Sequence, residues 1–207
     1  MKLESMQGNV ERSGVLVETS FSIENSPQAF NILANSLYAH KEQSVIRELS
    51  TNAVDEHIAN GIPDEPFEVH IPTILEPYFS IRDFGRGLCE EDAITLYTTF
   101  FKSTKRNSNN QIGCFGLGSK SPFAVTDSFT VESIFDGKKT VYTAFRDEDN
   151  FPKLAKLGVT ETTERTGVKI QFPVNSNFSV YREEAIRVYK FFKVKPTTNM
   201  QLCYDLP

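Results

Sequence analysis

The sequence predicts an α+β fold, a two-layer sandwich in which helices cover one face of a mixed, mostly antiparallel sheet. The first half of the chain reads as a strand, two helices, two strands and a helix, and residues 128–172 then hold a run of strand-like segments. An Asp-Gly pair at 136–137 predicts a hairpin between two of these strands. The 207 residues, 39% of them apolar, are enough for one domain with a substantial core.

The individual elements follow from periodicity and from residues typical of helix ends. In chain order we expect strand 15–23, helix 27–38, helix 43–60, strands 67–71 and 79–83, helix 90–98, strands 128–135 and 139–146, one or two strands within 153–172, and helix 178–192. Ser26 suits the N-cap and Pro27 the first position of the first helix. Gly61 suits the residue after the second helix. Residues 102–112, KSTKRNSNNQI, lack apolar periodicity and are predicted to be a loop.

One domain is expected to occupy residues 14–195. Residues 1–13 are expected to be a flexible polar leader, and residues 196–207 a linker or the start of a further domain. The N-terminus has no apolar segment of the signal-peptide kind. No apolar run approaches the ~20 residues that a membrane span needs.

The net charge and the cysteine spacing argue against a nucleic-acid ligand, a disulfide framework and a zinc site. The net charge of −5 argues against nucleic acid as the main ligand, because binding to a phosphate backbone usually requires a basic surplus. The three cysteines, Cys89, Cys114 and Cys203, are far apart and form no CxxC pair. This spacing fits a reducing cytoplasm and neither a disulfide framework nor a zinc site.

Residues 47–57, RELSTNAVDEH, combine a packing face with a polar face on one predicted helix. Glu48, Asn52 and Asp55 fall within an arc of roughly 60°. The adjoining arc is apolar: Val45, Ile46, Leu49 and Ala53. Such a polar face is equally typical of a solvated helix, so its function depends on the other motifs.

Two glycine motifs follow. DFGRG at 83–87 places Asp83 at the end of a strand, where glycines allow a sharp turn and a close approach to a ligand; a simple turn would explain it equally well. GCFGLGSKSP at 113–122 is neither a P-loop nor a Rossmann fingerprint. Its free backbone N–H groups nevertheless suit an anion, with Lys105 and Lys120 as added charge, unless it is only a flexible loop.

Taken in order, these segments resemble the GHKL (Bergerat-fold) ATPases, which include DNA gyrase B, MutL, the ninety-kilodalton heat-shock chaperone, MORC proteins and histidine kinases. E-x-x-x-N-x-x-D at 48–55 resembles the N-box of that family, and the two glycine motifs resemble its glycine boxes. TGVKI at 166–170 resembles its G-T-x-I strand. More narrowly, VIRELSTNAVDEH, IRDFGRGL, GCFGLGSKSPFAVTDSF and TGVKIQFPV resemble the N-terminal part of the rIIA lysis-inhibition proteins of T-even-type bacteriophages.

The resemblance implies a Mg·ATP site and assigns roles to its residues. Glu48 would be the general base, Asn52 the Mg²⁺ ligand, and Asp55 a residue behind them or the partner of a basic side chain. Asp83 would accept a hydrogen bond from the adenine N6 amine. The remaining candidate nucleotide-binding residues are Gly85, Gly87, Leu88, Lys105, Gly113, Gly116, Leu117, Gly118, Ser119, Lys120, Thr166 and Val168. Residues from about 97 to 112 would form a lid that orders over the nucleotide.

Two departures from the family lower the nucleotide affinity and the hydrolysis rate that we expect. Val168 stands where the family has a threonine that contacts adenine through water, so we expect modest affinity. In multi-domain family members a second domain supplies a Lys or Arg to the γ-phosphate, and we expect these 207 residues to hold no such domain. We therefore expect slow hydrolysis by this chain, which would be either a piece of a longer rIIA-like protein or a short relative of it.

Two functions from different classes follow from the resemblance. One is a phage ATPase module whose lid closure or homodimerisation regulates partner proteins in lysis inhibition or phage exclusion, with an rIIB-type partner. The other is a non-catalytic nucleotide switch or protein-interaction module that counteracts a host factor. Glu48 favours the first and Val168 the second. Either would act in the host bacterial cytoplasm, with only indirect contact at the inner membrane. His57 is expected to be a solvated helix residue.

Overall fold

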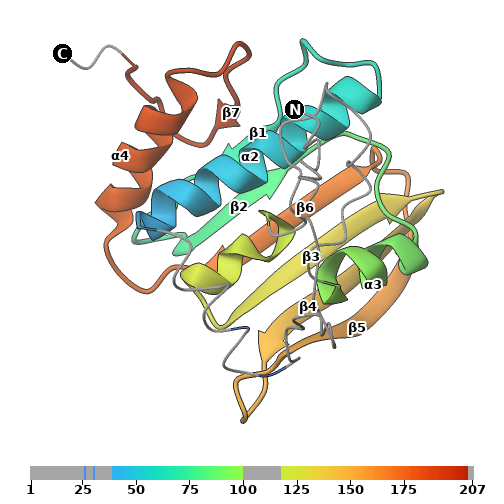
Figure 1. The fold of residues 1–207 in the computed structure, drawn as a ribbon. Helices are drawn as coiled ribbons and strands as arrows, with labels where there is room; N and C mark the ends of the chain where they lie inside the picture. Colours follow the sequence, from blue (N-terminus) through green and yellow to red (C-terminus); the bar gives the residue numbers. More distant parts are fainter. Residues whose placement is uncertain (1–25, 27–29, 31–38, 100–117, 205–207) are drawn as a thin grey trace, which may run out of the picture.

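A seven-stranded sheet with helices on one face forms the part of the chain that the computed structural model describes, namely residues 26, 30, 39–99 and 118–204 (Figure 1). The predicted two-layer α+β architecture is confirmed. The elements are α2 (Lys41–Ala59), β1 (Glu68–His70), β2 (Tyr78–Arg82), α3 (Glu90–Thr98), the 3₁₀ helix η2 (Gly118–Ala124), β3 (Ser128–Phe135), β4 (Lys138–Arg146), β5 (Pro152–Glu161), β6 (Gly167–Pro173), α4 (Phe178–Tyr189) and β7 (Thr197–Thr198).

The strands lie in the order β5-β4-β3-β6-β2-β1-β7. Every neighbouring pair is antiparallel except β1 and β7, which run parallel, so the sheet is mixed and mostly antiparallel as predicted. Asp136 and Gly137 join β3 to β4 with φ values of 49° and 69°. Positive φ at both positions matches the twist of a two-residue hairpin, which confirms the predicted turn.

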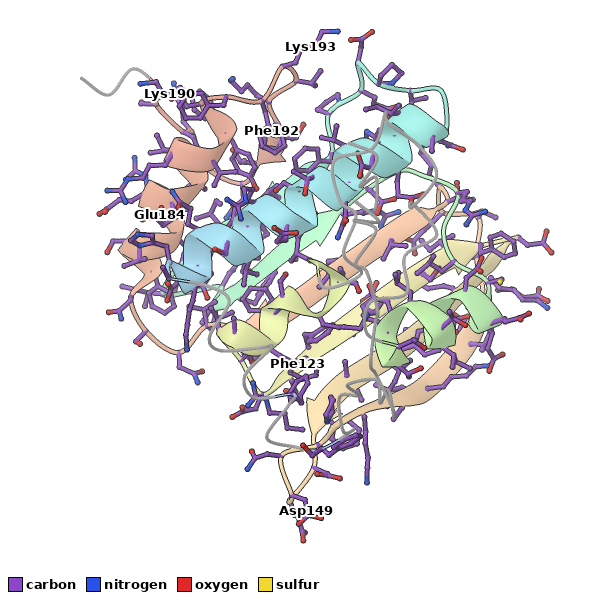
Figure 2. All side chains as sticks on the ribbon, in the orientation of Figure 1. Phe123, Asp149, Glu184, Lys190, Phe192 and Lys193 are labelled. Carbon is purple, nitrogen blue, oxygen red and sulfur yellow. The ribbon has the colours of Figure 1, made fainter. Side chains whose placement is uncertain are left out.

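The core lies between α2 and the sheet. The predicted apolar arc of α2 is buried, with every member at most 2% exposed: Val45, Ile46, Leu49 and Ala53. These side chains share one cluster with Phe79 of β2 and Phe172 of β6. Beside α2, η2 carries Phe123 (labelled in Figure 2). Its ring meets that of Phe129 edge-on, with 5.0 Å between centroids. The apolar arc therefore fixes the rotation of α2 and turns its polar arc toward η2 and the loop after β2.

The structure also differs from the expected boundaries. The helix α2 begins two residues before the expected position 43, and α4 ends at Tyr189 instead of 192. Residues beyond 195 join the sheet: β7 pairs with β1, and Leu202 is 8% exposed. Several expected segments lie outside the described residues: the leader 1–13, strand 15–23, loop 102–112 and most of helix 27–38. Within that last segment, Phe30 is helical and donates its N–H to Ser26 O at 3.1 Å.

None of the helices in the described part of the chain has the length and apolar character needed to cross a lipid bilayer.

A buried hydrogen bond joins the two long helices. The Ser50 hydroxyl on α2 donates to Ile46 O at 2.6 Å and lies 3.0 Å from the Tyr189 hydroxyl on α4. Because the Ser50 proton is already used, Tyr189 must donate to Ser50. Both side chains are fully buried, and burial raises the pKa of Tyr189.

Substitutions of Tyr189 and of Ser50 should lower the free energy of unfolding by different amounts. Tyr189→Phe removes donor and hydroxyl together and should cost about 1 kcal/mol, whereas Ser50→Ala strands a buried hydroxyl and should cost about 1–3 kcal/mol. Urea unfolding measures both. Tyr181→Phe on α4 is the control, since the Tyr181 hydroxyl bonds to no described residue, and it should change stability by less than about 0.5 kcal/mol. Equal effects of all three substitutions would contradict the assignment.

Candidate functional site

The second glycine motif and the polar arc of α2 are in contact. A Cβ atom built on Gly118 would lie only 3.0 Å from Glu48 Oε2 and 3.2 Å from Asn52 Nδ2. A side chain at position 118 would require these two flexible side chains to shift by a few tenths of an ångström, so glycine lets the backbone approach them without displacing either. An acid, an amide and the start of η2 thus form one polar corner, which can hold an anion or a hydrated cation.

The first glycine motif lies against the C-terminal half of the same helix. A Cβ atom on Gly85 would lie 2.9 Å from Glu56 Cβ. Asp83 directly follows β2, and its backbone N–H donates to Val168 O of β6 at 2.9 Å. The sheet and α2 therefore hold the 83–88 loop from two sides.

Asp83 carries a buried carboxyl with one oxygen engaged. Its Oδ1 accepts the backbone N–H groups of Gly85 at 2.9 Å and Val168 at 3.2 Å. No donor of the described residues reaches Oδ2. The side chain is 8% exposed, and burial raises its pKa to about 7 even though the two N–H donors favour the ionised form; the nearby Glu56 carboxylate adds to the rise. This oxygen is therefore a pre-positioned acceptor with no internal partner in the described chain.

The side chain of Ser133 and the backbone of β3 hold the C-terminal end of the 83–88 loop. The Ser133 hydroxyl of β3 accepts the Leu88 N–H at 2.7 Å and donates to Leu88 O at 3.0 Å. At Gly87, φ is +75°, and a Cβ atom would lie 2.1 Å from Ile134 O, so only glycine fits against β3. Leu88 itself packs against the core.

His57 holds the other end of the loop, and the expectation that it is solvated was wrong. The side chain is 2% exposed, and its Nε2 accepts the Phe84 N–H at 2.8 Å. The reason is its place on α2, one turn beyond the buried Ala53, so that it continues the packing arc. His57 and Ser133 are the two residues of this site that the motifs did not indicate.

The start of η2 contacts the C-terminal turn of α3. Lys120 is 4% exposed, and its Nζ donates to Leu96 O at 2.6 Å. The Ser119 hydroxyl lies 3.4 Å from the same carbonyl oxygen. Burial lowers the pKa of Lys120 to about 8. The described contacts therefore direct Lys120 Nζ at the C-terminal end of α3, and its expected role as a charge partner of phosphate stays a prediction.

The other expected site residues are placed as follows. Asp55 is 1% exposed within α2, Thr166 is half-buried just before β6, and Val168 is the second residue of β6. Lys105, Gly113, Gly116 and Leu117 lie outside the described residues, as do residues 100–112 of the expected lid. Glu48, Asn52, Asp83, Gly85, Gly87, Leu88, Gly118 and Ser119 line the region described above.

Comparison with known proteins gives this arrangement a family. Residues 31–168 match the sequence profile described as histidine kinase-, DNA gyrase B- and HSP90-like ATPase. The chaperone protein HtpG of Chlorobium phaeobacteroides is 30% identical over 195 residues, covering 80% of this chain and 30% of that protein. HtpG of Rickettsia akari is 33% identical over 134 residues, covering 54% and 21%. The chain thus spans less than a third of the length of these relatives.

Solved structures share the fold. The ATPase region of Saccharomyces cerevisiae topoisomerase II bound to ICRF-187 (dexrazoxane) has a TM-score of 0.59 at 14% identity, covering 77% of this chain and 48% of that one. The ATPase and transducer domains of topoisomerase II from Balamuthia mandrillaris give 0.58 at 19% identity, covering 76% and 46%. At these identities the likeness concerns architecture alone.

The buried Asp83 carboxyl should make the stability of the domain depend on pH. Its pKa is about 7 in the folded chain against a usual value of 3.8. Between these values the folded protein holds a proton that the unfolded chain has released. The free energy of unfolding should therefore fall as the pH rises from about 4 to about 7, and then level off. Urea unfolding across this range measures the slope.

The Asp83→Asn variant isolates this contribution. Asparagine keeps an oxygen for the Gly85 and Val168 N–H groups but does not ionise, so its slope should be flatter than that of the wild type. Asp149→Asn, at the exposed tip of the turn between β4 and β5 (Figure 2), should leave the slope unchanged. Parallel slopes for the wild type and Asp83→Asn would show that the Asp83 carboxyl is not the source.

Proposed function

Because the chain belongs to the histidine kinase-, DNA gyrase B- and HSP90-like ATPase family, we propose that it binds Mg·ATP and hydrolyses it slowly. Proteins of this family bind ATP, generally with Mg²⁺. The proposed site lies between α2, the 83–88 loop and η2. The observation that carries the proposal is the buried Asp83 carboxyl, whose Oδ2 has no donor among the described residues.

The Asp83 carboxyl suits adenine better than guanine. An ionised carboxylate only accepts hydrogen bonds, and adenine offers an N6 amine where guanine offers a carbonyl oxygen. Gly85, Gly87 and Leu88 would line the base. Val168 cannot supply the side-chain hydroxyl of the family's threonine, and its backbone N–H is already bonded to Asp83. We therefore propose adenine selectivity with modest affinity.

The polar corner at Gly118 fits the metal and phosphate end of the ligand. Hard cations such as Mg²⁺ bind carboxylate and amide oxygens and keep several waters, so Asn52 would hold the metal. Bound Mg²⁺ would neutralise negative charge on the phosphates. Glu48, beside Asn52, would orient the attacking water and accept its proton. The phosphate contacts would come from Gly113, Gly116, Leu117, Gly118 and Ser119, with Lys105 as charge partner.

The position of Lys120 supports slow turnover. Fast phosphoryl transfer needs positive charge at the γ-phosphate in the transition state. Lys120 instead donates to Leu96 O at 2.6 Å. The same observation, with Val168, favours a second candidate function, a nucleotide switch or protein-interaction module without catalysis.

We also propose a biological setting. The quoted segments around Glu48 and Gly118 support an rIIA-like phage protein, which would act in lysis inhibition in the host bacterial cytoplasm or peripherally at the inner membrane. ATP-driven closure of residues 97–112 and homodimerisation would then signal to phage or host proteins, including an rIIB-type partner. Light scattering with a bound ATP analogue reports such a dimer directly.

The adenine site is tested by replacing one atom of Asp83. Asp83→Asn puts an amide donor in place of an acceptor, so the affinity for a Mg·ATP analogue should fall about tenfold or more, and an inosine analogue should be weakened less. Calorimetric titration measures both ligands. Asp149→Asn should bind like the wild type. Unchanged ATP affinity in Asp83→Asn would show that the base does not contact this carboxyl.

Hydrolysis is tested at Glu48. Glu48→Gln should lower the turnover by about 100-fold or more while leaving ATP affinity nearly unchanged, because it removes the base but keeps the shape. Phosphate release under single-turnover conditions measures the rate. The control is Glu183→Gln on the exposed face of α4. A wild type that binds ATP but shows no Glu48-dependent phosphate release would favour the non-catalytic switch.

A further inference from the structure

We propose that His57 is a positioning residue for adenine recognition, which holds the backbone after Asp83 so that the carboxyl stays aimed at the base. The inference rests on the proposed function. His57 lies on α2, and the loop that it would position begins 26 residues later in the chain. Its imidazole bridges α2, the segment after α2 and the 83–88 loop.

The two hydrogen bonds of the ring define one tautomer. Nδ1 lies 3.0 Å from Glu65 O, which only accepts, so Nδ1 must carry the proton. Nε2 lies 2.8 Å from the Phe84 backbone N, which only donates, so Nε2 must be the acceptor. The neutral Nδ1–H form satisfies both partners. A second proton on the ring would set a donor against the Phe84 N–H.

Further contacts connect Phe84 to Glu65, whose backbone carbonyl accepts the hydrogen bond from His57. The guanidinium of Arg165 lies over the Phe84 ring, 4.7 Å from its centroid. Arg165 also forms two hydrogen bonds with the Glu65 carboxylate. Glu65 O in turn accepts from His57, so the four residues form a closed ring of contacts. This ring fixes both the backbone and the side chain of Phe84.

The position of Phe84 decides where Asp83 points. The Asp83 N–H is bonded to Val168 O on one side, and its Oδ1 accepts from Gly85 on the other. The intervening peptide, from Asp83 to Phe84, has its N–H on His57. Without that bond the peptide can rotate and carry the carboxyl away from the base. The loss should therefore fall on base recognition and spare the polar corner at Gly118.

A set of substitutions separates positioning from packing. His57→Phe keeps an aromatic ring and removes both hydrogen bonds. His57→Gln can place its amide oxygen near the Nε2 position and accept from Phe84, whereas the shorter His57→Asn retains only the donor toward Glu65. His70→Phe is the matched control, because His70 also bonds a backbone carbonyl, at 2.9 Å, but lies on β1 away from the loop.

Calorimetric titration with Mg·AMP-PNP and Mg·GMP-PNP gives the readout. His57→Phe and His57→Asn should lose about tenfold in AMP-PNP affinity, while their weaker GMP-PNP affinity changes by less than about twofold. His57→Gln should stay within about threefold of the wild type, and His70→Phe should match it. Equal losses for both nucleotides, no loss at all, or equal behaviour of the Gln and Asn variants would each overturn the inference.

Three further outcomes distinguish failure of this inference from misfolding of the variants and from failure of the proposed function. In the wild type, long-range ¹H–¹⁵N correlations of His57 should show a protonated Nδ1 and an unprotonated Nε2, and the reverse pattern would overturn the inference even if the variants misfold. A wild type that binds neither nucleotide would overturn the proposed function, and this inference with it. A wild type that prefers AMP-PNP, beside an unaffected His57→Phe, would overturn this inference alone.

Discussion

The site depends on the buried carboxyl of Asp83. A carboxylate removed from water is costly unless its oxygens find donors, and here the backbone supplies donors to one oxygen only. The Asp83 pKa near 7 reflects this burial, which the two N–H donors offset only in part. A ligand amine at Oδ2 would complete the solvation of the ionised form. Under the proposed function, the cost of burying this group would be linked to base selectivity, because the adenine amine would supply the donor that Oδ2 lacks.

The rest of the fold holds that carboxyl and the polar corner in a fixed relation. The apolar arc of α2 seats the helix on β2 and β6, and this sets the direction of Glu48 and Asn52. The loop after β2 is then fastened at one end by His57 and at the other by Ser133. Preorganised groups of this kind bind a ligand without the cost of ordering a mobile loop.

Much of this could be predicted from the sequence, because local patterns determined it. The arc on α2, the Asp136-Gly137 turn and the strand that leads into Asp83 were all visible in short windows. His57 was missed because a histidine near a helix end is usually solvated, although its spacing from Ala53 indicated the buried side. Ser133 and β7 could not be found, since each depends on a partner far away in the chain.

A crystal structure with a bound Mg·ATP analogue would show whether Asp83 Oδ2 receives the adenine amine. We expect adenine N6 within hydrogen-bond distance of Asp83 Oδ2, with the Gly85 and Val168 N–H groups still on Oδ1 and the phosphates beside Gly118. An analogue whose base lies elsewhere, with water or nothing at Oδ2, would show that this carboxyl does not recognise adenine, even if the phosphates occupied the polar corner.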